Sequence, residues 1–268
     1  MKEFYYEKNG LYYRKNEFKE DRNTVILVHG LSGSSKAWVP YEKKFEDKFN
    51  IVSLDLRGHG KSKKFPKYGD YEIKKFADDI NFLLEYLGIN KFIFVSHSLG
   101  TLIVFEFIAL YGEKVEGTIF LSPNYNIKNR LISNLIRPLL WPVPLLDLFP
   151  FTPKIGGHID YDKYKHKADW DLRRMYEDIS NTYLRIYLYC IKQSYNVDYE
   201  NLLNRIKMPT LIIHGKSDTI FPVKNAMLLS KKIENSKLIL IERGNHLIIF
   251  NNIPEVSGQI EEFITSKF

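Results

Sequence analysis

Ser98 stands where a short apolar run gives way to a helical pattern, in the segment Phe92-Ile93-Phe94-Val95-Ser96-His97-Ser98-Leu99-Gly100. A serine hydroxyl is a poor nucleophile at neutral pH unless a base removes its proton, and a third group must hold that base in the right tautomer. Nucleophilic chemistry at Ser98 therefore requires a histidine and a carboxylate from elsewhere in the chain.

This segment resembles the nucleophile elbow of the α/β-hydrolase family, G-x-S-x-G, with Ser96 in place of the first glycine. The elbow needs small residues two positions before and two after the nucleophile, because the strand and the helix approach closely there. Gly100 fits the second of these positions if Ser98 is the nucleophile. If Ser96 were the nucleophile, it would lie on the strand instead of the turn, so we predict Ser98.

The resemblance implies the other two members of a catalytic triad, because family members carry them in the order Ser, Asp or Glu, His. Asp218 follows the apolar run 210–213, and His246 follows the run 237–241 in a Gly-Asn turn. His246 is the expected base, and Asp218 is expected to orient it. We expect His158 and His166 to have a surface or packing role and His97 and His214 to shape their turns. His59 is expected in a loop near the site.

Two backbone N–H groups are expected to form the oxyanion hole, which stabilises the negative charge that develops on the substrate oxygen. One belongs to Leu99, directly after the nucleophile. The other is assigned to Leu31, because His29-Gly30-Leu31 resembles the family's His-Gly-x oxyanion turn.

Strands and helices that would position these residues alternate along the chain. The dipeptide Asn9-Gly10 suits a tight hairpin turn between two short strands. Continuous apolar runs then predict strands that are covered on both faces, at 25–28, 51–54, 92–95, 118–121, 210–213 and 237–241. Apolar residues at three and four residue spacing predict helices at 38–45, 73–87, 99–111, 225–233 and 253–263. The expected fold class is α/β, an α/β-hydrolase fold with a mostly parallel sheet of about eight strands and helices on both faces.

The segment 122–207 interrupts this alternation, since it has several helical patterns, a cluster of prolines and no clear strand. We predict that 1–121 and 208–268 form the core and that 122–207 is a helical lid over the carboxyl edge of the sheet, where ligands bind in such folds. The apolar run 131–141 favours a hydrophobic substrate, with Leu140 and Trp141 as expected binding residues.

Cleavage of carboxylic esters with hydrophobic acyl groups is the leading functional hypothesis. The same triad also serves thioesters, lactones and carbon-carbon bonds, because the fold and the triad do not fix the substrate. Family members that open epoxides or remove halides place Asp at the nucleophile position, so Ser98 argues against those reactions. A small-ligand receptor with little turnover is the alternative from a different class.

Composition narrows the partners and the location. The net charge of +7 comes from lysines spread over the whole length, which argues against nucleic acid as a partner and leaves transient contact with lipid surfaces as a secondary hypothesis. The single cysteine, Cys190, and the lack of an apolar segment near the N-terminus favour the cytoplasm. The histidine and cysteine spacing predicts no metal site, and the chemistry requires no cofactor.

Overall fold

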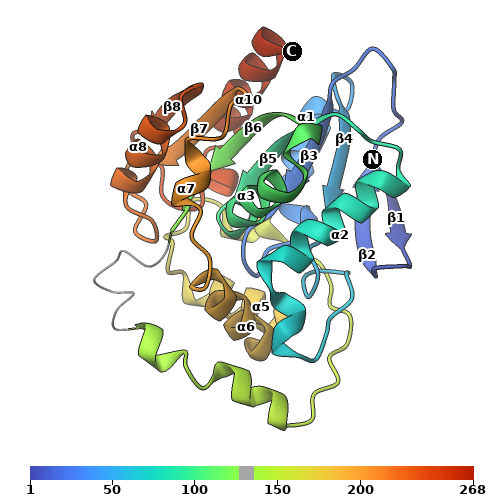
Figure 1. Ribbon diagram of the computed structural model, residues 1–268, viewed down its shortest axis with the longest axis vertical. Coiled ribbons are helices and arrows are strands. Elements are labelled where there is room, and N and C mark those ends of the chain that lie inside the picture. Colours follow the sequence, from blue (N-terminus) through green and yellow to red (C-terminus); the bar gives the residue numbers. More distant parts are fainter. Residues whose placement is uncertain (127–135) are drawn as a thin grey trace.

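A single eight-stranded sheet forms the centre of the protein, in the order β1-β2-β4-β3-β5-β6-β7-β8 (Figure 1). The computed structural model describes residues 1–126 and 136–268. The pairs β1/β2 and β2/β4 are antiparallel and the other pairs are parallel. This confirms the predicted hairpin and the mostly parallel sheet. The strands are β1 (Lys2–Tyr6), β2 (Leu11–Lys15), β3 (Thr24–Val28), β4 (Asn50–Leu54), β5 (Phe92–His97), β6 (Val115–Leu121), β7 (Thr210–Gly215) and β8 (Ser236–Ile241).

Helices cover both faces of the sheet, because successive side chains of each central strand point to opposite faces and both sets are apolar. In β3, Ile26 and Val28 pack into one core cluster with helices α2, α3 and α8, whereas Val25 and Leu27 pack into the other with α1, α9 and α10. These helices are α1 (Val39–Phe45), α2 (Ile73–Tyr86), α3 (Leu99–Tyr111), α8 (Val223–Lys232), α9 (Ile248–Asn251) and α10 (Ile253–Lys267).

Several helix boundaries differ from the predicted ones: α2 ends one residue earlier, α8 spans 223–232 instead of 225–233, and α1 and α10 differ as follows. Trp38, the expected start of the first helix, ends a 3-10 turn (η1, Ser35–Trp38), and α1 begins at Val39. Pro40 lies in the first turn of α1, where the missing N–H of proline costs no helical hydrogen bond. Helix α10 continues past the expected end at Phe263 to Lys267.

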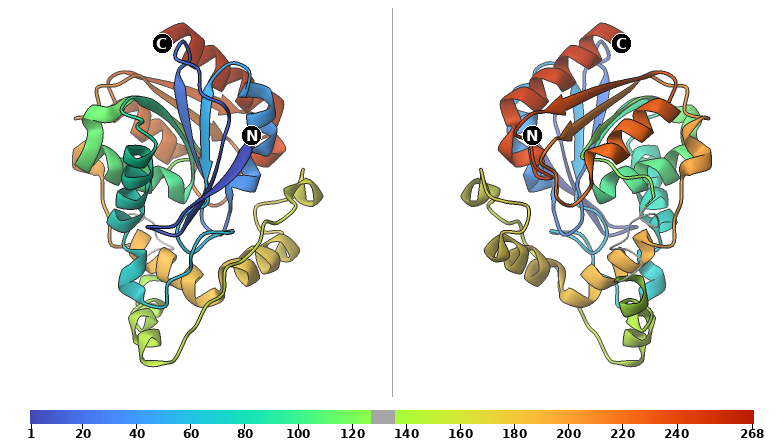
Figure 2. Two further views of the ribbon diagram at one scale, coloured as in Figure 1. Left: turned by 90° about the vertical axis from the view of Figure 1, so that its right-hand side faces the viewer. Right: turned by 90° about the vertical axis from the view of Figure 1, so that its left-hand side faces the viewer.

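Between β6 and β7 the described residues form helices and loops at one end of the sheet (Figures 1 and 2). Part of the apolar run 131–141, residues 131–135, lies outside the described residues. None of the helices in the described ranges combines the length and the apolar character needed to cross a membrane. The elements here are η4 (Val143–Leu148), η5 (Tyr161–Tyr164), α5 (Leu172–Thr182), α6 (Leu184–Ser194) and α7 (Glu200–Leu203). Two further 3-10 turns lie elsewhere in the chain, η2 (Tyr68–Tyr71) and η3 (Gly112–Lys114).

Candidate active site

Ser98 forms the sharp turn between β5 and α3, with φ of +51° and ψ of −116°. Such a backbone conformation is strained for a residue with a side chain, and strain of this kind concentrates at functional sites. Small neighbours make the turn possible. A Cβ atom at Gly100 would lie 2.8 Å from the carbonyl oxygen of Val28, and one at Gly30 would lie 3.1 Å from Ser98 Cβ. Ser96 is fully buried, so its small side chain fits where the family pattern has glycine.

His246 lies between Ser98 and Asp218, and its two ring nitrogens contact one residue each. Its Nε2 is 2.9 Å from Ser98 Oγ, and its Nδ1 is 2.8 Å from Asp218 Oδ2. The acid and the base follow β7 and β8, so parallel pairing of these strands brings their loops to the same edge as the turn after β5. The structure thus brings together all three residues of the predicted triad.

Asp218 is held as a carboxylate. Its Oδ1 accepts hydrogen bonds from the backbone N–H groups of Ile220 (2.8 Å) and Phe221 (2.6 Å). Burial raises the pKa of Asp218, but its hydrogen bond and charge interaction with His246 outweigh burial and leave the pKa below its ordinary value. An ionised Asp218 accepts a hydrogen bond from Nδ1–H, which leaves Nε2 of His246 free to accept a hydrogen bond from the Ser98 hydroxyl.

The two predicted oxyanion residues, Leu31 and Leu99, both line the cavity that contains Ser98. Leu99 is the first residue of α3, so its N–H has no acceptor within the helix. The turn before Leu31 is fixed by His29, whose Nε2 accepts the N–H of Leu56 (3.0 Å) and whose Nδ1 therefore donates to Gly30 O (2.8 Å). Burial lowers the pKa of His29 to about 4, so the ring stays neutral in this role.

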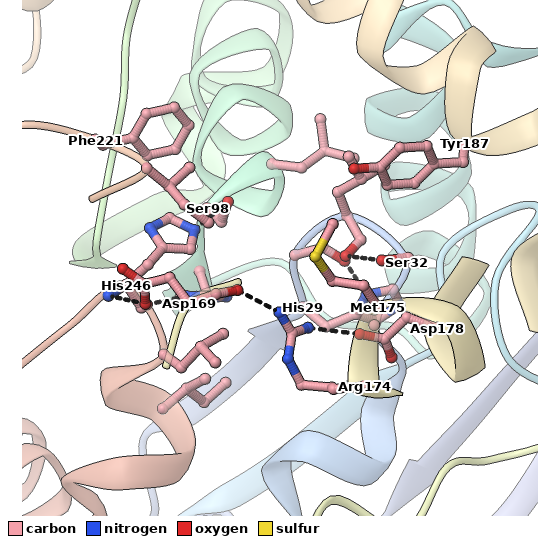
Figure 3. Close-up of a pocket in the computed structure, with 18 of the residues that line it drawn as sticks. His29, Ser32, Ser98, Asp169, Arg174, Met175, Asp178, Tyr187, Phe221 and His246 are labelled. Atoms are coloured by element: carbon pink, nitrogen blue, oxygen red, sulfur yellow. Dashed lines mark hydrogen bonds and ion pairs between the residues drawn. The ribbon is translucent and has the colours of Figure 1, made fainter. Parts of the chain in front are cut away.

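A cavity of about 420 Å³ opens beside Ser98 and is lined mainly by apolar side chains. This volume falls within the range of small-molecule sites. Residues of the core and of helices α5 and α6 line it together (Figure 3). The apolar lining includes Leu31, Leu99, Leu102, Met175, Ile179, Ile191, Ile220, Phe221, Leu247, Ile249 and Phe250.

One wall of the cavity is polar and charged. Arg174 and Asp178 form an ion pair at 2.6 Å on α5, and both are buried. Burial raises the pKa of Asp178 to about 7, although the charge of Arg174 acts in the opposite direction. The local sequence gave no sign of this wall, because it arises where α5 packs over the strand ends.

Leu140 and Trp141, the expected substrate-binding residues, are not brought to this cavity. Neither residue lines the cavity: Leu140 is buried in the core cluster of α2 and α3, and Trp141 is 68% exposed on the outside. Successive turn hydrogen bonds, Leu140 N–H to Arg137 O and Val143 N–H to Leu140 O, give this segment a tight curl. Adjacent side chains consequently point to different sides. Met175 and Ile179 of α5 contact the cavity instead, and their three to four residue spacing was the available signal.

Three of the remaining histidines, His59, His97 and His214, are buried, whereas His158 is partly exposed and His166 is exposed. Nε2 of His97 is 3.0 Å from the carbonyl oxygen of His246, and Nε2 of His214 is 3.0 Å from that of Phe221. Burial lowers the pKa of both His97 and His59 to about 3. His158 is 2.7 Å from the buried carboxylate of Asp55, a contact that joins the segment after β6 to the loop after β4. Within the described ranges, no group of three or more potential metal-ligating His, Cys, Asp or Glu side chains is present.

Known proteins resemble this chain over most of its length. A family model described as alpha/beta hydrolase fold matches residues 23–253. The chain is 27% identical to a proline iminopeptidase of Pestalotiopsis fici, over 85% of this chain and 87% of the relative. It is 23% identical to a monoacylglycerol lipase of Homo sapiens, over 91% of this chain and 75% of the relative.

Solved structures resemble the fold as a whole. The TM-score is 0.77 for MGS-M2, an alpha/beta hydrolase enzyme from a Medee basin deep-sea metagenome library, at 20% identity and with 98% and 97% of the two chains covered. It is 0.74 for a thermophilic esterase from Thermogutta terrifontis, at 21% identity and with 96% and 93% covered. At these identities the likeness concerns the fold alone.

Proposed function

Because the chain belongs to the α/β-hydrolase fold family, we propose that it is a serine hydrolase that cleaves carboxylic esters through an acyl-enzyme intermediate. The observation that carries the proposal is the hydrogen-bonded chain from Ser98 Oγ through the ring of His246 to the Asp218 carboxylate, with distances of 2.9 and 2.8 Å. These are the contacts that an activated serine needs before substrate arrives.

In the proposed reaction, His246 Nε2 takes the Ser98 proton as Oγ attacks the ester carbonyl carbon. The N–H groups of Leu31 and Leu99 donate to the resulting oxyanion. His246 then gives the proton to the alcohol oxygen as the ester C–O bond breaks, and the acyl group remains on Ser98. A water molecule loses a proton to His246 and attacks the acyl carbon, Ser98 regains a proton, and the carboxylic acid leaves. Asp218 keeps the imidazole ring in position throughout.

The lining of the cavity supports a hydrophobic acyl group as the preferred substrate part. We assign residues 1–121 and 208–268 to the catalytic core and 122–207 to a helical lid, because α5 and α6 close the cavity beside Ser98. Met175 and Ile179 give the lid side an apolar surface that suits an acyl chain. The proposed substrate is therefore a small-molecule ester. We also propose that the protein acts in the cytoplasm.

Transient contact with lipid surfaces is a further part of the proposal. A set of large apolar side chains is exposed at the outer end of the lid; we call it the apolar tip, and it consists of Leu139, Trp141, Leu145, Leu148 and Phe149. Two cationic side chains donate hydrogen bonds to backbone carbonyl oxygens in or beside the apolar tip. Lys67 donates to Asp147 O (3.2 Å), and Arg185 donates to Phe149 O (3.0 Å). Apolar and cationic groups together suit the surface of an anionic bilayer.

Hydrolysis of p-nitrophenyl esters from acetate to decanoate tests the proposed activity. We expect turnover by the unchanged protein and loss of at least about a thousandfold in kcat for Ser98→Ala, since the nucleophile is removed. Ser266→Ala, on the outer helix α10, is the matched control and should keep full turnover. Thioester and lactone substrates in the same assay identify the preferred bond. Equal ester turnover by Ser98→Ala and the unchanged protein would refute the proposal.

A further inference from the structure

Asp169, in the loop before α5, connects the two loops that carry the catalytic acid and base. Its Oδ1 accepts a hydrogen bond from the backbone N–H of His246 at 2.8 Å (Figure 3). Its Oδ2 accepts hydrogen bonds from the backbone N–H and the hydroxyl of Thr219, at 3.0 and 2.8 Å. Thr219 directly follows Asp218. One carboxylate from the lid therefore contacts the base itself and the neighbour of the acid.

The side chain of Asp169 is buried without a cationic partner among the described residues, since Asp169 is only 3% exposed and no ion pair joins its carboxylate. An isolated buried charge is costly, and the three hydrogen bonds from N–H and O–H donors are what make this one tolerable. Each of those donors belongs to a loop of the triad. The carboxylate consequently connects the lid to both loops of the triad.

Contacts on the other side of Asp169 attach it firmly to α5. Its carbonyl oxygen accepts from Arg174 at 2.9 Å, and Arg174 is paired with Asp178. The neighbouring Trp170 donates its indole N–H to the Thr219 hydroxyl at 3.0 Å. The lid segment and the loop after β7 thus form one hydrogen-bonded unit.

The bases of the two triad loops are already in contact without Asp169. Ser217 donates its N–H to Gly244 O at 2.8 Å, and a Cβ atom at Gly215 would lie 2.3 Å from that same oxygen. The loops are therefore fixed where they leave β7 and β8. At their catalytic ends, Asp169 adds a second connection beside the contact between Asp218 and His246.

On the basis of the proposed function, we propose that Asp169 is a positioning residue that sets the separation of Asp218 and His246, so that docking of the lid completes the triad. In Asp169→Asn, an amide NH2 replaces one acceptor oxygen and faces N–H or O–H donors, which pushes one loop away. A misplaced base slows the chemical step and leaves the acyl cavity unchanged.

The experiment compares p-nitrophenyl butyrate kinetics of the whole protein and of Asp169→Asn, Asp169→Ala, Thr219→Val and Asp171→Asn. Thr219→Val removes the hydroxyl contacts with Asp169 and Trp170 and keeps the backbone N–H contact with Asp169. Asp171→Asn is the matched control, because Asp171 caps α5 through the N–H of Arg174 and lies in the same loop. We expect kcat to fall at least about tenfold in both Asp169 variants and less in Thr219→Val, with KM changing less than about twofold. Asp171→Asn should match the unchanged protein.

A proton NMR measurement adds a readout that general loosening of the lid would not move. The low-field signal of the Nδ1 proton shared by His246 and Asp218 should be present in the unchanged protein and in Asp171→Asn, and weakened or shifted in Asp169→Asn. Unchanged kcat and an unchanged signal in Asp169→Asn would overturn the role of Asp169, as would an equal loss of kcat in Asp171→Asn. Ser98→Ala distinguishes failure of the Asp169 role from failure of the proposed function. If only the role of Asp169 fails, Ser98→Ala is inactive, whereas it remains active if the proposed function itself fails.

Discussion

The turn at Ser98 is packed so tightly that one added carbon atom on a neighbouring glycine would overlap the backbone. The positive φ of Ser98 costs about 1–3 kcal/mol, and the structure around the turn must hold it in place. Gly100 contributes by letting α3 approach the end of β3, where the carbonyl oxygens of Val28 and His29 would lie 2.8 and 2.7 Å from a side chain. The same close approach keeps the N–H of Leu99 at the cavity.

Gly100→Ala tests this close approach. We expect the free energy of unfolding to fall by about 1–3 kcal/mol, because the added methyl group overlaps two carbonyl oxygens and the backbone must shift. Ester turnover should fall with it. Gly258→Ala is the control, since Gly258 lies within α10 with open space around it and should gain about 0.5–1 kcal/mol. Urea unfolding measures both, and equal stability of Gly100→Ala and the unchanged protein would contradict the packing argument.

Individual elements could be predicted from the sequence where their cause is local. The apolar runs, the hairpin at Asn9-Gly10 and the small residues around Ser98 each depend on neighbours a few positions away. The contacts of the lid do not: Asp169 meets His246 across 77 positions, and His158 meets Asp55 across 103. The four-residue spacing of Met175 and Ile179 predicts a shared helix face, but only the packing of α5 over the strand ends turns that face toward the cavity.

The contact between the lid and the loop after β4 makes stability depend on pH. Asp55 is fully buried and accepts from Ser35 N–H, Lys61 N–H and His158 Nε2, each at 2.7 Å. Burial raises the pKa of Asp55, but the hydrogen bond and charge of His158 and its other partners outweigh burial and lower the pKa to about 2 from 3.8. The stabilisation is therefore present above about pH 4 and lost as the pH falls from about 4 to about 2.

Asp55→Asn tests this dependence. The free energy of unfolding of the unchanged protein exceeds that of Asp55→Asn, and we expect this difference to be about 2 kcal/mol smaller at pH 2 than at pH 4. A lowering of the Asp55 pKa from 3.8 to about 2 corresponds to a stabilisation of that size. Urea titrations at several pH values measure it. Asp160→Asn removes an exposed carboxylate near His158 and should leave the pH dependence unchanged. If the difference in free energy of unfolding between the unchanged protein and Asp55→Asn stays constant from pH 5 to pH 2, Asp55 is not the source of the pH dependence.

Helix α5 should set the length of the acyl chain. Ile179→Trp fills part of the cavity, so we expect kcat/KM for p-nitrophenyl decanoate to fall roughly tenfold or more while acetate is little affected. Leu172→Trp, on the exposed side of the same helix, is the control and should change neither. The ratio of the two kcat/KM values is the measurement. If that ratio is the same in Ile179→Trp and the unchanged protein, the acyl chain does not lie along α5.

In the molecule as a whole, a net positive charge accompanies the exposed apolar groups of the lid. The chain carries a net charge of +7, and the apolar tip includes Leu148, which is 77% exposed, and Phe149, which is 62% exposed. In the lipid contact that we propose, positive charge draws the molecule toward an anionic surface, and the apolar side chains then enter the boundary between headgroups and acyl chains.

Sedimentation with lipid vesicles tests this orientation. We expect binding to vesicles of phosphatidylglycerol and phosphatidylcholine, little binding to phosphatidylcholine alone, and weakening with added salt. The double variant Leu148→Glu with Phe149→Glu should bind at least about tenfold more weakly, because it removes apolar contact and adds negative charge. Met227→Glu, an exposed apolar position on the core, should retain binding. Equal binding of both variants would show that the apolar tip is not the contact.

The proposed reaction requires the Ser98 hydroxyl as the nucleophile, and covalent labelling with a fluorophosphonate followed by peptide mass spectrometry identifies the reactive serine. We expect one adduct per chain, on Ser98, formed much more slowly in His246→Ala and absent from Ser98→Ala. An adduct on Ser96 or another serine, or no adduct in folded protein that hydrolyses esters, would contradict it.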